Sequence, residues 1–466
     1  MQRLTGLDAA FLALETPACH MHVIGVAVLD PSTAPPGPFH ERARELRLAR
    51  IPHVPPLRRR LVEVPFGLNV PSWIDDPDFD IDYHLRRAAL PAPGGPEELA
   101  AFVAEVAGRS LDRGHPLWQA FVVEGLENGH QAFITKIHHS LIDGVAGVAI
   151  LAALFDFEAD TPMVPETEPP EAFRPEAKPS DQEMLARAMA DLVTQPAKMY
   201  RAVRKSVPNA VRAVQRVRGS EHDVALPLAT PRLSMNRSIT PHRSVAFSSV
   251  QLADVKALKN ALGVTVNDVV LAMTTGALRK YLEGRDELPD RPLVAAIPTS
   301  VRGEGDAQFG NKVSSMFAAL PVELADPLTR VEAIADSMKG AKEMHEEVGN
   351  STLEDWAELA SPLLFSRAMR AYSRLRVGER MRPVINLVAS NVPGPPFPLY
   401  FAGARMVALH PLGPIFDDCG LNLTVISYLD HIDFGFLASR ELVPDVDVLA
   451  EAVPETLQEL MKAAGL

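Results

Sequence analysis

The chain has 466 residues, of which 47% are hydrophobic and 23% charged, a balance typical of a folded globular protein and a length that suits two domains. Acidic residues outnumber basic residues by 59 to 46, and the net charge of −13 excludes nucleic acid as a main partner because phosphates repel such a chain. Cys19 and Cys419 are the two cysteines and stand far apart, so we expect a reducing compartment and neither a disulfide framework nor a bound metal.

The apolar runs are too short to predict a secretory signal or a membrane span. The N-terminal stretch "MQRLTGLDAAFLALE" is interrupted by Asp8 and Glu15, and the longest apolar run is "VAGVAILAALF" from Val145. We therefore expect a cytoplasmic protein that does not span the membrane.

Three segments follow one another along the chain. Residues 1–160 alternate strand-like runs such as "HVIGVAVLD" and "QAFITKI" with helical runs such as "PEELAAFVAEVAGRSL", which predicts a mixed α/β lobe. Residues 161–240 form a linker and crossover. Residues 241–466 return to alternating strands and helices, including "RSVAFSSVQL", "ADVKALKNAL", "PLVAAIPTSV", "VINLVASNV" and "LNLTVISYL", and predict a second α/β lobe.

The middle segment is proline-rich and then basic. Residues 161–180 hold six prolines and four glutamates, too few apolar side chains for a packed element. Residues 192–220 contain no acid and seven lysines and arginines, beside apolar residues at helical spacing. This stretch fits either a helix packed across the two lobes or a helix that lies on an anionic membrane surface.

The stretch "FITKIHHSLIDGVAG", at residues 133–147, carries the candidate chemistry. A buried strand precedes it and a buried helix follows, so its polar residues lie at a turn inside the protein, where each needs a partner or a role. Gly144 permits a tight turn, and Asp143 can cap the helix or pair with an arginine. If His139 faces a cavity, its ring can accept a proton near neutral pH, with His138 as a structural neighbour.

Other interpretations of the two histidines remain open. A buried histidine can be a satisfied core residue, and adjacent histidines can bind a metal, although no third ligand lies nearby in the sequence. The sequence contains no G-x-S-x-G, G-x-x-x-x-G-K-[ST], H-E-x-x-H or dinucleotide motif. This favours a base that acts directly on a bound nucleophile, without an acyl-enzyme.

These residues carry a resemblance to a known family. "HHSLIDG" matches the HHxxxDG signature of acyl-CoA-dependent acyltransferases, which include chloramphenicol acetyltransferase-like proteins and nonribosomal peptide condensation domains. Along nearly its whole length the chain resembles the bacterial wax ester synthase/acyl-CoA:diacylglycerol acyltransferase family. The stretches that match, in chain order, are "LTGLDAAFLALE", "WIDDPDFDIDYHLRR", "LDRGHPLW", "NDVVLA", "IPTSVR", "SNVPGP" and "GLNLTVISY".

The resemblance implies a fold and a catalytic centre. The fold would be two chloramphenicol-acetyltransferase-like lobes joined by a long crossover, with a tunnel between them that reaches His139 from both sides. His139 would be the catalytic base and Asp143 would hold the shape of the motif, which His138 and Gly144 complete. Asn267 is a candidate donor to the developing oxyanion.

Further residues of the matching stretches are candidates for the substrate-binding site, and each has a structural alternative. Asp268, like Asn267, can simply cap its helix, Trp118 can be a core aromatic, and the turn "SNVPGP" can line an acyl or pantetheine path or be a plain turn. Arg58, Arg59 and Arg60 can pair with Asp143, bind coenzyme A phosphates or form a solvated basic patch. The candidate substrate-binding residues are Pro116, Leu117, Trp118, Asp268, Ser390, Asn391, Pro393 and Gly394.

The implied reaction is direct transfer of a long-chain acyl group from acyl-CoA, the co-substrate, to diacylglycerol, a long-chain alcohol or both, without a bound cofactor. Because both substrates are lipidic, we expect peripheral association with a membrane or lipid inclusion. An amine or carrier-bound acceptor, a thioesterase reaction and a non-catalytic lipid-associated role remain as alternatives.

Overall fold

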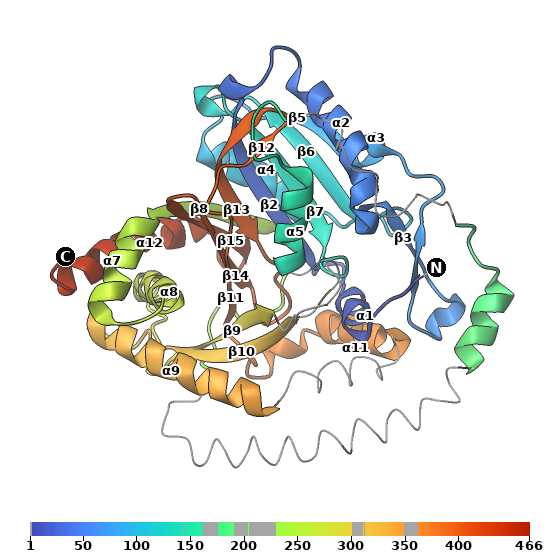
Figure 1. Ribbon diagram of the computed structural model, residues 1–466. Coiled ribbons are helices and arrows are strands. Elements are labelled where there is room, and N and C mark those ends of the chain that lie inside the picture. The colour runs from blue at the N-terminus through green and yellow to red at the C-terminus, as the bar shows by residue number, and fades with distance from the viewer. Residues whose placement is uncertain are drawn as a thin grey trace.

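The computed structural model describes residues 2–142, 144–161, 176–190, 204, 230–300, 311, 313–348 and 362–466. Two six-stranded mixed sheets form the framework of these residues, and a three-stranded sheet lies at one edge (Figure 1). The prediction of a two-lobed mixed α/β protein is confirmed.

The first sheet contains the strand that leads to the histidine motif. Its order is β12 (Tyr400–Phe401), β13 (Ala404–Leu412), β2 (His22–Asp30), β7 (Gln131–His138), β6 (Trp118–Glu124) and β5 (Leu85–Ala89). All neighbours pair antiparallel except β5 and β6. The main-chain partner of His138 is His22, which places the two histidines side by side across β7 and β2.

The second sheet is built only from the C-terminal half of the chain. Its order is β10 (Val313–Leu320), β9 (Leu293–Ser300), β11 (Leu387–Val392), β14 (Leu421–Tyr428), β15 (His431–Ser439) and β8 (Arg243–Gln251). The three-stranded sheet consists of β1 (Gln2–Arg3), β4 (Ser72–Asp75) and β3 (Arg59–Val62).

Helices cover both sheets, and the expected helices of the second lobe are present. The helices of the first half are α1 (Gly6–Ala13), α2 (Phe39–Arg50), α3 (Ile81–His84), α4 (Pro96–Ala107) and α5 (Gly144–Leu154). Those of the second half are α7 (Leu252–Leu262), α8 (Val266–Glu283), α9 (Pro327–Val348), α11 (Pro362–Arg374) and α12 (Val446–Ala463). Within the described residues no single helix has the length and apolarity needed to cross a membrane, and the one bent pair that passes on length and composition, α7 with α8, turns by 104°.

Helix α4 connects the cores of the two lobes. Its residues Leu99 and Val103 pack with Ile134 of the first sheet and with Val245 and Leu437 of the second sheet in one hydrophobic cluster. Burial of these side chains removes apolar surface of both sheets from water, which favours a fixed contact between the lobes.

Strand β13 is a second connection, and its location was not foreseen from the sequence. By sequence it belongs to the C-terminal segment, yet it pairs with β2 and so completes the first sheet. The N–H of Leu409 on β13 donates to Oδ2 of the buried Asp433 on β15 at 2.9 Å. Strand β13 therefore bonds to both sheets.

The crossing of β13 over β15 requires a glycine at position 435. A Cβ atom there would lie 2.0 Å from the carbonyl oxygen of Pro411, far inside van der Waals contact with backbone that cannot move alone. Because Gly435 has no side chain, the two sheets can approach each other closely here.

We expect Gly435→Ala to lower the free energy of unfolding by about 1–3 kcal/mol, the usual cost of overpacking a close contact. Urea unfolding followed by circular dichroism measures it. The matched control is Gly284→Ala at the end of α8, where the backbone is right-handed and a Cβ would meet its nearest neighbour at an ordinary 3.5 Å. Equal stability of the two variants would contradict the steric explanation.

Candidate active site

His139 immediately follows β7, and its main chain is held from two directions. Its N–H donates to the carbonyl oxygen of Met21 at 2.8 Å, and its own carbonyl oxygen accepts from Nδ2 of Asn311 at 2.6 Å. Its half-buried ring stacks on Phe11 of α1, with ring centroids 4.2 Å apart. The imidazole is therefore oriented by packing and by hydrogen bonds of the turn.

Two unusual features support this turn. Met21 has a positive φ of 48°, a conformation that costs energy for a non-glycine residue and that here accompanies a carbonyl directed at the N–H of His139. Asn311 is 5% exposed and donates both to His139 and to Oδ1 of Asp8 on α1, at 2.7 Å. Asn311 precedes β10 of the second sheet, so this one amide joins the second lobe to the motif.

His138 points into the protein and is 1% exposed. Its Nδ1 accepts from the main-chain N–H of Ser140 at 3.0 Å, so the neutral ring carries its proton on Nε2. That nitrogen lies 3.8 Å from Oε1 of Glu15, which Arg113 binds through Nη2 at 2.6 Å. Burial and the charge of Arg113 lower the pKa of His138 well below its usual value. His138 thus has the contacts of a neutral, structural histidine.

The buried face behind His138 carries further titratable groups. Burial lowers the pKa of His20 to about 4, lowers that of His22 well below its usual value and lowers that of Lys136 to about 7. Lys136 Nζ donates to the carbonyl oxygens of Val106 at 2.9 Å and Arg109 at 2.5 Å. Desolvation favours the neutral form of each of these groups.

The remaining residues of the motif are described in part. Gly144 begins α5, whereas Asp143 lies outside the described residues, and its expected role in holding the motif stays a prediction. No group of three or more histidine, cysteine, aspartate or glutamate side chains that could hold a metal ion occurs in the described part of the chain.

The basic triplet is not a solvated patch. Arg58 is 3% exposed, so that interpretation is wrong for it. Arg59 Nε lies 3.6 Å from an oxygen of Asp75, and Arg60 Nη1 lies 3.1 Å from an oxygen of Asp76. Arg59 and Arg60 therefore form ion pairs with the last residue of β4 and with the residue that follows it.

The residues of the PLW motif, Pro116, Leu117 and Trp118, are all buried and support the motif strand. The carbonyl oxygen of Leu117 accepts the N–H of His138 at 2.9 Å. The indole N–H of Trp118 donates to the carbonyl oxygen of Leu57 at 2.8 Å, and its ring stacks on that of His84 at 4.4 Å. Trp118 therefore has the contacts of a core aromatic, one of the two alternatives considered for it.

The ND pair begins α8, and its two members make different contacts. Oδ2 of Asp268 accepts from the N–H and hydroxyl of Thr265 at 2.9 and 2.7 Å, while the Asp268 N–H donates to the Thr265 hydroxyl. This is a capping box, so Asp268 caps the helix. Asn267 instead accepts through Oδ1 from Nδ2 of Asn391 on β11 at 3.3 Å, which leaves its own amide N–H groups as donors.

The turn after β11 lies against β14. Ser390 and Asn391 pair in parallel with Thr424 and Val425. A Cβ at Gly394 would lie 2.0 Å from the carbonyl oxygen of Ser427, so only glycine fits there. The fourth candidate of this turn, Pro393, is exposed.

Sequence reasoning missed several residues that position His139. Phe11 and Glu15 lie in a stretch that was singled out only for its resemblance, and neither was assigned a role. The contribution of Met21 depends on a backbone angle that no residue type indicates. Asn311 follows a glycine in a loop, and nothing local marks it as a partner of a histidine 172 positions earlier.

Structural comparison first defines the class of protein. The first condensation domain of the calcium-dependent antibiotic synthetase superposes with a TM-score of 0.60 at 16% identity, over 99% of this chain and 96% of that one, and so shares the fold. This likeness defines the class of fold, a two-lobed mixed α/β protein.

The family follows from closer matches. The family model described as the wax ester synthase/diacylglycerol acyltransferase catalytic domain matches residues 4–270, and the corresponding C-terminal domain model matches residues 309–461. The chain belongs to the wax ester synthase/diacylglycerol acyltransferase family, and it is an acyltransferase.

Individual relatives cover the whole chain. A Mycobacterium tuberculosis protein with the name "Putative diacyglycerol O-acyltransferase" is 36% identical over 100% of this chain and 91% of its own length. The solved wax ester synthase/diacylglycerol acyltransferase from Marinobacter aquaeolei VT8 superposes with a TM-score of 0.72 at 28% identity, over 100% of both chains.

We expect Asn311→Ala to lower kcat by about 10- to 100-fold, because small displacements of a catalytic group are that costly. Steady-state kinetics at saturating substrate measures the loss. The control is Asn386→Ala, which removes a fully buried asparagine with three hydrogen bonds in the second lobe and no contact with the motif. If Asn386→Ala, corrected for its folded fraction, lost as much kcat, Asn311 would be structural only.

The free energy of unfolding should fall as the pH drops from 6.5 towards 4. The pKa of His20 is lowered to about 4 in the folded chain, so the unfolded chain binds more protons over this range. At about 1.4 kcal/mol per pKa unit, His20→Gln should remove up to about 3 kcal/mol of this loss. Urea unfolding at several pH values measures the slope, with His130→Gln on the half-exposed β6–β7 connection as control. An unchanged slope in His20→Gln would contradict the assignment.

Proposed function

We propose that the protein transfers a long-chain acyl group from acyl-CoA to diacylglycerol, a long-chain alcohol or both, and so forms triacylglycerol or wax ester. His139 is the general base. The family membership and the names of the relatives support the substrates, and the turn that holds His139 supports the role of its ring.

The single observation that carries this role is the contrast between the two adjacent histidines. His138 is buried, neutral and engaged through Nδ1, whereas the His139 ring is half-buried on Phe11. A general base must reach a substrate proton, and of the two only His139 is oriented by its surroundings without being enclosed by them.

The reaction needs one base for both proton transfers. The His139 imidazole removes the proton of the acceptor hydroxyl as its oxygen attacks the thioester carbonyl carbon. The tetrahedral intermediate then collapses, the carbon–sulfur bond breaks, and the imidazolium returns the proton to the departing thiolate. Water must be excluded from the site, since it would otherwise replace the alcohol.

Asn267 is the candidate donor to the oxyanion of that intermediate. Its Oδ1 accepts a hydrogen bond from Asn391, and its amide N–H groups are the donors that it can offer to the oxyanion. Loss of one such donor typically costs about 10²–10³-fold in kcat. Asp268 is not needed for this purpose because its carboxylate caps α8.

The location of the reaction follows from its substrates. Diacylglycerol and long alcohols dissolve in membranes and lipid inclusions, so we place the protein in the cytoplasm at the surface of such a phase. The tunnel to His139 stays a prediction, since residues 301–310 beside Asn311 lie outside the described residues. The basic stretch at residues 192–220 lies outside them too.

We expect His139→Ala to lower acyl transfer by roughly 10²–10⁴-fold, the usual contribution of a general base. Radiolabelled palmitoyl-CoA is incubated with hexadecanol or dioleoylglycerol, and the products are resolved by thin-layer chromatography. The ratio of wax ester to triacylglycerol identifies the preferred acceptor. His130→Ala is the control and should keep full activity.

Other products would favour the other candidate reactions. Free fatty acid alone from the wild type would indicate a thioesterase. No turnover with either acceptor would indicate an amine or carrier-bound acceptor or a non-catalytic role, and transfer by His139→Ala at the wild-type rate would exclude His139 as the base.

A further inference from the structure

The segment from α11 to β11 is strongly basic in an acidic protein. Residues 362–384 contain six arginines and one glutamate, a net charge of +5, while the whole chain carries −13. All six arginines are exposed. They are Arg367, Arg370, Arg374, Arg376, Arg380 and Arg382.

The arginines of α11 lie on one face of the helix. Arg367, Arg370 and Arg374 recur at spacings of three and four residues, which brings them to the same side. The half-buried Phe365, Met369 and Tyr372 recur at the same spacings on another side, and the Tyr372 hydroxyl donates to Asp418. The helix thus packs with an apolar face and presents a cationic face to solvent.

Large apolar side chains are exposed beside these arginines. Leu375 is 65% exposed and Met381 55%, both in the turn that contains η6 (Val377–Glu379), and Val384 follows. Phe66 in η4 (Pro65–Gly67), which contacts α11, is 77% exposed. Exposed apolar side chains that gather on a surface, rather than being scattered singly, are typical of an interaction site.

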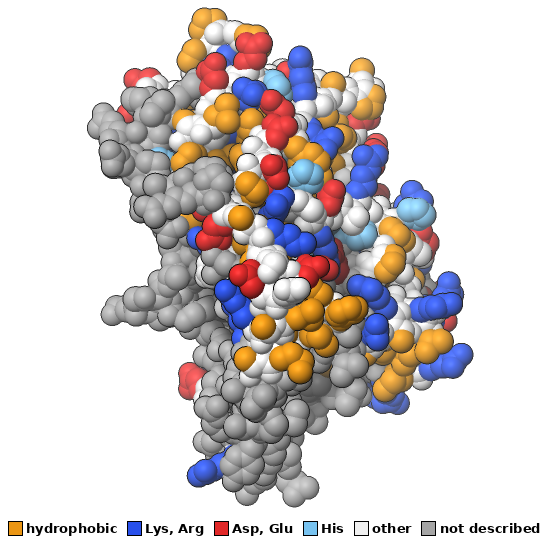
Figure 2. Space-filling model, turned by 90° about the vertical axis from the view of Figure 1, so that its right-hand side faces the viewer, with side chains coloured by type: hydrophobic (Ala, Val, Ile, Leu, Met, Phe, Trp, Pro, Cys, Tyr) orange, Lys and Arg blue, Asp and Glu red, His pale blue; other side chains and the backbone are white. Residues whose placement is uncertain are grey.

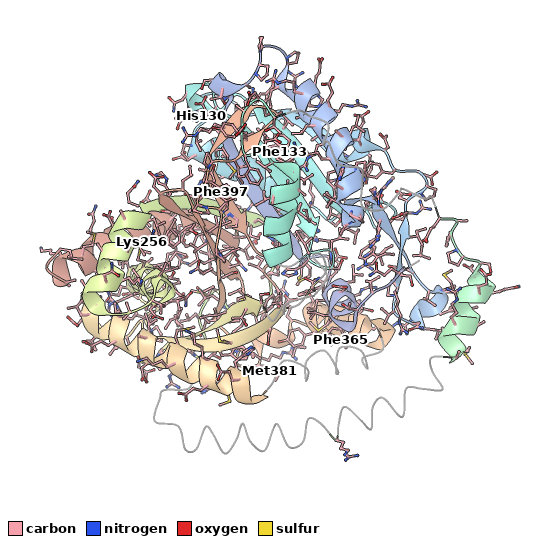
Figure 3. The ribbon with its side chains drawn as sticks, in the orientation of Figure 1. His130, Phe133, Lys256, Phe365, Met381 and Phe397 are labelled. Atoms are coloured by element: carbon pink, nitrogen blue, oxygen red, sulfur yellow. The ribbon has the colours of Figure 1, made fainter. Side chains whose placement is uncertain are left out.

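The figures locate α11 and Met381 at one side of the molecule. Helix α11 lies beside α1 at the lower right of Figure 1, and Phe365 and Met381 are labelled at the lower edge in Figure 3. Figure 2 turns that side to the viewer and shows hydrophobic side chains gathered beside Lys and Arg side chains over its lower half.

This surface is also close to the candidate active site. Helix α11 contacts α1, which carries the Phe11 ring stacked on His139. Arg370 is near enough to lower the pKa of Glu15, the neighbour of His138, although burial of Glu15 outweighs it. A hollow of about 730 Å³ beside the turn after α11 is lined by charges of both signs, which are Arg232, Arg237, Arg376, Glu287 and Glu379.

We propose that the surface formed by the six arginines with Phe66, Leu375, Met381 and Val384 docks the protein on an anionic lipid surface. Guanidinium groups attract lipid phosphates and the apolar side chains enter the headgroup region, the combination that holds peripheral proteins at membranes. The interface would bring the catalytic turn next to the phase that dissolves the acceptor. In that last respect the inference rests on the proposed function.

A protein partner is the main rival for such a surface. The arginine side chains favour lipid because they are spread over one face rather than around a pocket for one ligand, and because Arg367, Arg370, Arg374, Arg380 and Arg382 have no ion pair among the described residues. An acidic protein partner would be expected to bind in the absence of lipid.

The test is sedimentation of the full-length protein with vesicles of phosphatidylcholine alone or mixed with phosphatidylglycerol, at low and high salt. The wild type should bind only the mixed vesicles and lose binding at high salt. The triple variant Arg367→Glu/Arg374→Glu/Arg380→Glu should bind roughly 100-fold more weakly, at about fivefold for each arginine lost. Met381→Ser should weaken binding to the mixed vesicles at low salt, where the wild type binds.

The matched control makes the same change of charge elsewhere. Lys256→Glu/Arg405→Glu/Arg440→Glu alters three exposed cations away from this surface, with Lys256 on α7 at the left of Figure 3. This control should bind like the wild type, and thermal unfolding checks that both triple variants are folded.

Two results would overturn the proposal: wild-type binding by the folded Arg367→Glu/Arg374→Glu/Arg380→Glu variant, or no binding of the wild type to either kind of vesicle. The measurement contains no acyl-CoA, so it does not depend on acyl transfer. A wild type that binds vesicles but transfers no acyl group would contradict the proposed function and leave the docking surface supported.

Discussion

Two hydrogen bonds to the main chain of His139 set the position of the ring that we propose as the general base. One comes from the left-handed Met21 at the entry of β2, and the other from Asn311 ahead of β10. The first ties the histidine to its own sheet and the second ties it to the other lobe. Since Asn311 also holds Asp8 on α1, a single buried amide fixes the ring, the helix it stacks against and the second lobe relative to one another.

The titratable and charged side chains around this turn fall into a buried group behind the motif and an exposed group on the surface. Behind the motif, desolvation favours the neutral forms of His138, His22, His20 and Lys136, which suits a densely packed support. On the outside, the arginines of α11 and of the turn after it are exposed to solvent, where they can attract anions. Burial thus disfavours charge behind the motif, whereas the cationic side chains of this second region stand in water.

The contact between the lobes is itself part of the site. Strand β13 leaves the second half of the chain, completes the first sheet and bonds to Asp433 of the second, while α4 packs against both. A rigid relation between the lobes is what allows Asn311, which is distant in sequence from His139, to bind the main chain of His139. The crossing depends on glycine at 435, where backbone atoms approach too closely for any side chain.

The sequence alone determined the local elements and the chemistry. The apolar run of β7, the all-apolar α5 and the polar turn between them identified the motif because periodicity and burial are local properties. The cap formed by Asp268 and the core position of Trp118 were among the alternatives it offered, and only side-chain contacts selected them. Only the tertiary structure decided that β13 pairs with β2, that Arg58 is buried and that Asn311 binds the main chain of His139. The first and third depend on residues more than 100 positions apart in the sequence, and the burial of Arg58 depends on packing that no local pattern encodes.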